Sequence, residues 1–93
     1  MLFLLYSTQM AGGFTERSLD SIDPKIMSLV SDYMLNTIKQ NDFKITQVQS
    51  QVVAGINFKF AVEFGGKRAI LVVFRSLSQQ IEVSSYTELN DEM

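Results

Sequence analysis

The spacing of apolar residues divides the chain into a helical part and a strand part. Between residues 24 and 40, apolar side chains recur at intervals of three and four, which places them on one side of a helix. They are Ile26, Met27, Leu29, Val30, Tyr33, Met34 and Ile38. Pro24 follows Asp23, a good N-cap residue, and proline is favoured at the first helical position. We therefore predict a helix over residues 24–40 that ends at Asn41 and Asp42.

After residue 41 the hydrophobic period changes from about 3.6 to 2, which is typical of strands with one buried face. In residues 56–64 the apolar positions are Ile56, Phe58, Phe60, Val62 and Phe64. Gly65 and Gly66 then supply a tight hairpin turn. The return strand, residues 68–75, holds Ile70, Val72 and Phe74 on one face. A third strand is predicted over residues 81–88.

Two weaker strand signals precede these. Residues 43–51 have an extended pattern whose phase slips between Ile45 and Val48, which indicates a β-bulge. A short strand around residues 14–18 could add an edge to the sheet. The predicted fold class is α+β: one long helix packed on the concave face of a four- to five-stranded antiparallel sheet. Without the helix, the sheet would expose a row of phenylalanines.

Composition narrows the function. The 93 residues favour a single domain. The chain has no cysteine and no histidine, which excludes disulfides, a cysteine nucleophile, and the commonest general base and zinc ligand. We therefore expect no enzyme, no metal and no cofactor. The net charge of −2 provides no basic surface for a phosphate backbone, so nucleic acid is not an expected partner.

The start of the chain requires a separate interpretation. The apolar run of residues 1–6 is too short to span a membrane, and no basic residue precedes Arg17, so it is a poor signal sequence. We interpret residues 1–9 as a flexible extension and residues 10–93 as the domain, and Met10 could itself be an initiator. Because cysteine is absent, we expect a cytoplasmic protein. Because the apolar run is too short to span a membrane, we expect no membrane partner. Secretion is the alternative if residues 1–9 belong to a signal.

The segment over residues 51–55 is unusual for a hairpin tip. It reads Gln-Val-Val-Ala-Gly, whereas tight hairpins favour Asn-Gly or Asp-Gly. Val52, Val53 and Ala54 would be exposed there, which soluble proteins normally avoid unless a partner covers them. The alternative is that the valines belong to a strand and face the core. The local sequence leaves both interpretations open.

These residues resemble the Gln-x-Val-x-Gly loop of the cystatins, inhibitors of papain-like cysteine proteases, and Ser50 extends the similarity to the stefin branch. Two further features follow in the family's order: Gly12-Gly13 before the helix, and Val-Phe-Arg-Ser-Leu over residues 73–77. The resemblance implies a cystatin-like fold and a reversible competitive inhibitor of cathepsin-type proteases. Such an inhibitor blocks the protease cleft with a three-part wedge made of an N-terminal trunk and two hairpin loops.

The resemblance also implies which residues bind the protease. They are Met10, Ala11, Gly12, Gly13, Gln51, Val52, Val53, Ala54, Gly55, Leu77 and Ser78. By this resemblance Met10 and Ala11 occupy the non-primed pockets, Val53 lies near the catalytic centre and Leu77 contacts the primed side. Gly12 lets the trunk bend close to the protease surface, Gln51 fixes the loop base and Gly55 permits the turn.

Some alternatives remain at this stage. Ser78 stands where stefins commonly carry proline, which predicts a softer second hairpin. This departure motivates a second hypothesis, a cystatin-fold module that has lost inhibition and binds another protein. Gly12-Gly13 could be only a flexible joint, and Leu77 an ordinary strand-end residue. We expect a monomer, with a dimer formed by exchange of the hairpin at residues 51–55 as the alternative.

Overall fold

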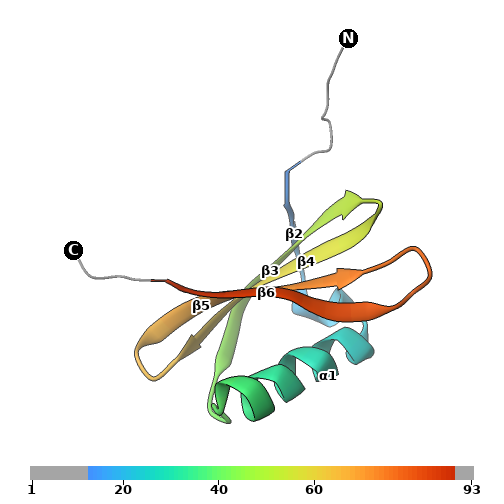
Figure 1. The fold of residues 1–93 in the computed structure, drawn as a ribbon. Helices are drawn as coiled ribbons and strands as arrows, with labels where there is room; N and C mark the ends of the chain where they lie inside the picture. The colour runs from blue at the N-terminus through green and yellow to red at the C-terminus, as the bar shows by residue number, and fades with distance from the viewer. Residues whose placement is uncertain (1–12, 90–93) are drawn as a thin grey trace.

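The computed structural model describes residues 13–89, so Met10, Ala11, Gly12 and the predicted extension of residues 1–9 lie outside the described residues. The described chain forms five antiparallel strands in the order β2-β3-β4-β5-β6, with one helix across a face of the sheet (Figure 1). The strands are β2 (Thr15–Arg17), β3 (Lys44–Val53), β4 (Gly55–Phe64), β5 (Lys67–Arg75) and β6 (Ile81–Leu89), and the helix is α1 (Pro24–Tyr33). The predicted α+β architecture is confirmed.

The start of α1 follows the predicted capping. The Asp23 side chain accepts a hydrogen bond of 2.9 Å from the backbone N–H of Lys25, and Pro24 occupies the first turn. A short 3-10 turn, η1 (Leu19–Ser21), leads from β2 into this cap. The cap satisfies a backbone donor that would otherwise have no partner inside the helix.

The end of the helix differs from the prediction. The regular α-helix stops at Tyr33 and continues as one turn of π-helix, η2 (Met34–Ile38). Lys39 then adopts the left-handed conformation, with φ 68° and ψ 35°. The N–H groups of Lys39 and Gln40 both donate to the Met34 carbonyl oxygen, which closes the helix. The predicted helix is therefore correctly placed, but its last turn is wider than an α-helix.

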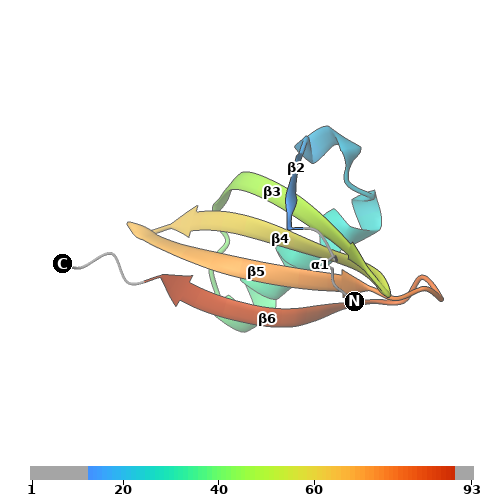
Figure 2. The same cartoon turned by 90° about the horizontal axis from the view of Figure 1, so that it is seen from above.

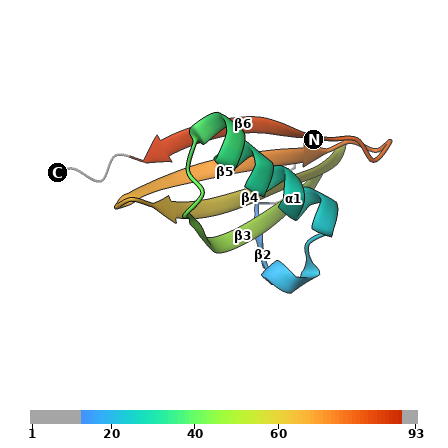
Figure 3. The same cartoon turned by 90° about the horizontal axis from the view of Figure 1, so that it is seen from below.

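The core lies between α1 and the sheet, which crosses behind the helix in Figure 3. Its buried residues are Ile22, Ile26, Val30, Met34, Val48, Phe58, Phe60, Val62, Phe64, Ala69, Leu71 and Val73. The predicted alternation of β4 is confirmed from Phe58 to Phe64, and Ile56 at the strand's start is half-buried. The helix therefore covers the row of phenylalanines, as the sequence predicted.

Strand β5 is apolar on both faces. Ile70, Val72 and Phe74 do share one face, but the core takes the alternate residues Ala69, Leu71 and Val73. The first three are half-buried on the side of the sheet away from the helix. The face of β5 away from the helix is therefore apolar but only partly covered.

Register and turns complete the sheet. The predicted bulge is confirmed by a register shift between Ile45 and Gln47. A second shift, between Val72 and Val73 where β5 pairs with β6, was not predicted. Gly65 and Gly66 have φ values of 54° and 78°, so both occupy the left-handed region that a tight hairpin requires. The short strand predicted around residues 14–18 is present as β2.

One polar group is enclosed where the helix meets the last strand. The Tyr86 ring of β6 packs against the Tyr33 ring of α1, with centroids 5.7 Å apart. The Tyr86 hydroxyl is buried and has no hydrogen-bond partner among the described residues. Burial, and after it the nearby Glu88 carboxylate, raise the pKa of Tyr86 above its ordinary value.

Candidate functional site

The first loop joins β3 to β4 through a very tight connection. Val53 pairs with Gly55 across the hairpin, which leaves Ala54 at the tip. The exposed fraction is 72% for Val52 and 38% for Val53. The two valines therefore lie outside the core, and the interpretation in which they face inward is wrong. An exposed apolar tip on a well-paired hairpin is a feature that a partner's surface would cover.

The position of Gly55 accepts no other residue without strain. Its φ is +119°, a conformation that residues with a side chain rarely adopt. A Cβ atom there would lie 2.5 Å from the Arg75 carbonyl oxygen and 2.7 Å from the Phe74 ring. Gly55 therefore permits the turn, as predicted, and also lets β5 approach the loop closely.

The base of the first loop is braced by side chains. Gln51 and Asn57 face each other across β3 and β4. The Asn57 side-chain amide donates a hydrogen bond of 3.3 Å to the Gln51 amide oxygen. This bond lies where the sequence predicted that Gln51 would fix the loop base. Phe14 lies beside the same strands, with its ring centroid 4.4 Å from the ammonium group of Lys59.

The second loop joins β5 to β6 and is held by a small hydrogen-bond network. The Ser76 N–H donates to the Gln80 carbonyl oxygen at 2.8 Å, and the Gln79 N–H donates to the Ser76 carbonyl oxygen at 3.0 Å. The Ser76 and Ser78 hydroxyls share a hydrogen bond of 2.9 Å. The softer loop expected without proline stays a prediction, but Ser78 takes part in the bonds that hold it.

The two loops meet at one end of the sheet (Figure 2). A groove of about 250 Å³ lies between them. It is lined by Val52, Val53, Gly55, Ile56, Arg75, Ser76, Leu77 and Gln79. Leu77 is 78% exposed, so it projects from the second loop much as Val52 projects from the first. The structure thus brings together both hairpins of the predicted wedge.

The described start of the chain lies at the same end. Thr15 pairs with Ser50, immediately before the first loop, and Gly13 precedes Thr15 by only two residues. Gly13 is exposed, and a Cβ atom there would meet nothing within 4 Å. No steric contact in the structure therefore requires glycine at this position. The protease contact that the resemblance implies for Gly13 stays a prediction.

The sequence did not predict that Arg75 would belong to this site. Arg75 ends β5, pairs with Ile56, and borders the groove between the loops. Its guanidinium lies 5.5 Å from the centroid of the Phe58 ring and 4.0 Å from an Asp23 carboxylate oxygen. The only available signal was its place next to the second loop. Its contacts depend on three elements that are distant in sequence.

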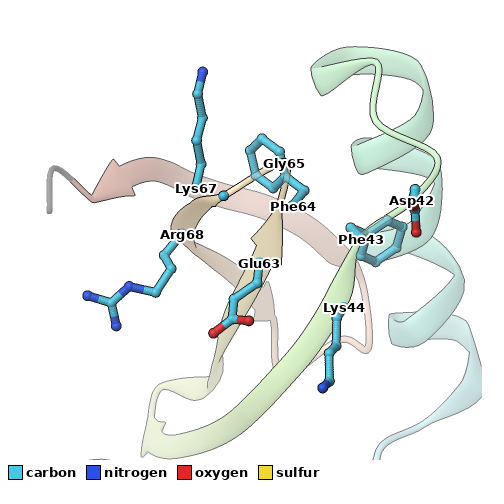
Figure 4. A pocket seen from close by; sticks show the side chains of 9 residues that line it. Asp42, Phe43, Lys44, Glu63, Phe64, Gly65, Lys67 and Arg68 are labelled. Carbon is cyan, nitrogen blue, oxygen red and sulfur yellow. The ribbon is translucent and has the colours of Figure 1, made fainter.

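A larger groove, about 490 Å³, lies away from both loops (Figure 4). It is formed by the start of β3 and by the hairpin at Gly65 and Gly66. Cross-strand neighbours Lys44, Glu63 and Arg68 place charges of alternating sign along it. None of the predicted site residues within the described part of the chain borders this groove. Among residues 13–89, no group of three or more His, Cys, Asp or Glu could hold a metal ion.

Comparisons with known proteins agree with this geometry. No family model matches the chain, and no curated protein matches it. The structure is similar to that of a secreted type 1 cystatin from Fasciola hepatica, with a TM-score of 0.63 and 26% sequence identity. The match covers 87% of this chain and 99% of the Fasciola chain.

The fold and the paired loops therefore define a cystatin-like protein. The chain has the cystatin fold, and the similar structure supports the predicted resemblance to the cystatins. Cystatins are protease inhibitors and not enzymes, which supports the expectation that this chain is not an enzyme. No helix in the described part of the chain is long and apolar enough to cross a membrane.

Proposed function

We propose that the protein is a reversible, competitive inhibitor of papain-like cysteine proteases of the cathepsin type. The observation that carries the proposal is the meeting, at one end of the sheet, of two loops that each expose apolar side chains: Val52 and Val53 on the first and Leu77 on the second. The first loop and the order of the two loops resemble those of the cystatins, and the fold is the cystatin fold.

The proposed mechanism needs no chemistry from the inhibitor. Val52, Val53 and Leu77 displace water from an apolar cleft, and the release of that water favours binding. The first loop is already ordered by the hydrogen bond between Asn57 and Gln51, so little conformational freedom is lost on binding. The wedge fills the cleft without placing a peptide bond within about 3–3.5 Å of the nucleophile in an aligned geometry, so cleavage is slow.

The remaining residue roles follow from the same resemblance. We place Met10 and Ala11 in the non-primed pockets, with Gly12 bending the trunk toward the protease and Gly13 beside it in the same trunk. Val53 lies nearest the catalytic centre, with Ala54 beside it at the loop tip. Ser78 accompanies Leu77 on the primed side.

Titration of papain with the purified protein tests the proposal. Inhibition should be reversible and should raise the apparent KM with kcat unchanged. Val53→Asp should weaken inhibition by at least about tenfold, because a carboxylate would be buried in an apolar cleft. Lys67→Glu, at the distant hairpin, is the control and should inhibit like the wild type. Absence of inhibition at micromolar concentrations of the wild type would overturn the proposal.

A second candidate is a non-inhibitory interaction module with the same fold. The observation behind it is Ser78, at the position where stefins commonly have proline. Pull-down from lysate, with and without a blocker of cysteine-protease active sites, separates the two candidates. Partners whose capture is unaffected by the blocker would favour the module.

Two properties belong with the proposed function. We propose a monomer, and size-exclusion chromatography at raised concentration would reveal exchange of the first hairpin between two copies.

The lack of cysteine favours the cytoplasm, whereas the similar Fasciola protein is a secreted cystatin, which makes secretion the alternative. Sequencing the N-terminus of natural material would show whether residues 1–9 are retained.

A further inference from the structure

A third groove, of about 390 Å³, lies beside the loops on the helix side of the sheet. It is lined by Arg17, Ser21, Asp23, Ser50, Val52, Ile56, Phe58 and Arg75. Val52, Ile56 and Arg75 also border the groove between the loops. The two grooves are therefore adjacent, and a partner that covers the loops lies close to the third groove.

The third groove carries an excess of positive charge. The charged residues that line it are two cations, Arg17 and Arg75, and one carboxylate, that of Asp23. One Asp23 oxygen caps the helix by accepting from the Lys25 N–H, and the other lies 4.0 Å from the Arg75 guanidinium, beyond ordinary hydrogen-bond length. Arg17 is exposed and has no ion-pair partner among residues 13–89. This local excess contrasts with the chain's net charge of −2.

The floor of the groove suits an anionic side chain. The Phe58 ring lies under the Arg75 guanidinium at 5.5 Å, which restricts where that cation can move. Ser50 is a polar residue in the floor with only 9% of its surface exposed. A carboxylate entering between the two arginines would form charge-assisted hydrogen bonds in a partly desolvated setting, where such bonds are stronger than in open water.

We propose that this groove receives the carboxylate of an Asp or Glu on the rim of the target protease's cleft. The inference rests on the proposed function and adds a specificity element to it. Arg17 and Arg75 select proteases that carry an acidic residue beside the point where the first loop enters. The excess charge also speeds association at low ionic strength, because opposite charges steer the encounter.

The test compares inhibition constants of wild type, Arg17→Glu and Lys67→Glu. The enzyme is the papain-like protease, from a panel, that the wild type inhibits most tightly, assayed at about 50 mM and about 500 mM NaCl. Both variants change the net charge equally, but Lys67 lies in the distant groove. Arg17→Glu should weaken inhibition about tenfold at low salt and much less at high salt. Lys67→Glu should stay within about twofold of the wild type.

The outcomes separate this inference from the proposed function. If the wild type inhibits and Arg17→Glu matches it at low salt, the anionic subsite is overturned and the inhibitor proposal stands. An equal loss at both salt concentrations would also overturn the subsite, because a screened charge contact must depend on salt. If the wild type inhibits no protease of the panel, both fail. Thermal melting of Arg17→Glu, an exposed position, checks that the variant is folded.

Discussion

At the scale of single residues, Gly55 has the strictest requirement in the first loop. Its backbone conformation and its contacts with β5 both exclude a side chain. Gly55→Ala should lower the free energy of unfolding by about 2–4 kcal/mol, the sum of backbone strain and overpacking. Urea denaturation measures this loss. Gly66→Ala is the control, since it has positive φ but no nearby atom, and should cost about 1 kcal/mol. Equal losses would contradict the contact with Phe74.

Tyr86 makes the stability of the folded protein depend on pH in the alkaline range. Because burial raises its pKa in the folded state, the folded protein holds this proton above pH 10.0 while the unfolded chain releases it. The contribution of this group to the free energy of unfolding is fully present below pH 10.0. It is lost as the pH rises through the folded-state pKa. Tyr86→Phe should remove this part of the loss, which paired denaturation series at neutral and alkaline pH would measure.

The same substitution has a consequence at neutral pH. The Tyr86 hydroxyl is buried without a well-formed hydrogen bond among the described residues. The Glu88 carboxylate that interacts with it is exposed, so water can solvate that carboxylate and removal of the hydroxyl leaves no buried group newly unpaired. The free energy of unfolding of Tyr86→Phe should match or exceed that of the wild type. A loss of more than about 1 kcal/mol at neutral pH would show that the hydroxyl has a bonding partner.

At the scale of elements, the backbone conformation at the end of the helix is energetically less favourable than the capped start. Asp23 and Pro24 form a strong beginning, but the helix closes on Lys39 in the left-handed conformation, where glycine is the usual residue. The π-helical turn before it is a second departure from regular helix geometry. The last turn is therefore a place where stability can be gained.

Lys39→Gly should raise the free energy of unfolding by about 0.5–1 kcal/mol. The gain is the relief of left-handed strain, less the entropy that glycine loses on folding. Lys39→Ala is the matched control, since it removes the same charge but keeps the strain, and it should give no gain. Thermal or urea denaturation distinguishes the two variants. Equal stabilities for both would indicate that removal of the charge, rather than the backbone, sets the effect.

At the scale of the whole molecule, the proposed wedge needs the trunk and both loops at one end. Deletion of residues 1–13 should weaken protease binding by about 1–4 kcal/mol, the range of a hot-spot loss, and leave the fold intact because β2 begins at Thr15. Gly12→Glu should act in the same direction. Deletion of residues 1–9 alone is the control and should leave affinity unchanged. Inhibition constants measure all three, and equal affinity for the longer deletion would show that the trunk does not bind.

Much of the fold could be predicted because each element carries its own local pattern. The helix stripe, the alternation of β4 and the slip near Ile45 are all visible within a few residues. The buried face of β5 was not predictable, because Leu71 and Val72 are both apolar and the pattern is the same from either side. The register shift beside Val73 has no local signal, since it depends on how β5 meets β6.

The candidate site was predictable in part, for a related reason. Val52 and Val53 were ambiguous alone, and the resemblance favoured exposure before the structure showed it. Arg17 and Arg75 were missed because they become neighbours of one groove only when β2, the helix cap and β5 come together. A constellation of this kind depends on tertiary arrangement and leaves no spacing signature along the chain.

Because the Gly65-Gly66 hairpin lies away from the two loops, the protein can be attached to a dye or a surface through that hairpin without covering the loops. Since the sequence contains no cysteine, Lys67→Cys would introduce a unique thiol at that remote hairpin. A dye or a solid support coupled there would orient every copy in the same way, with Val52 and Leu77 facing the solution. The surface-bound molecules would then capture a protease uniformly.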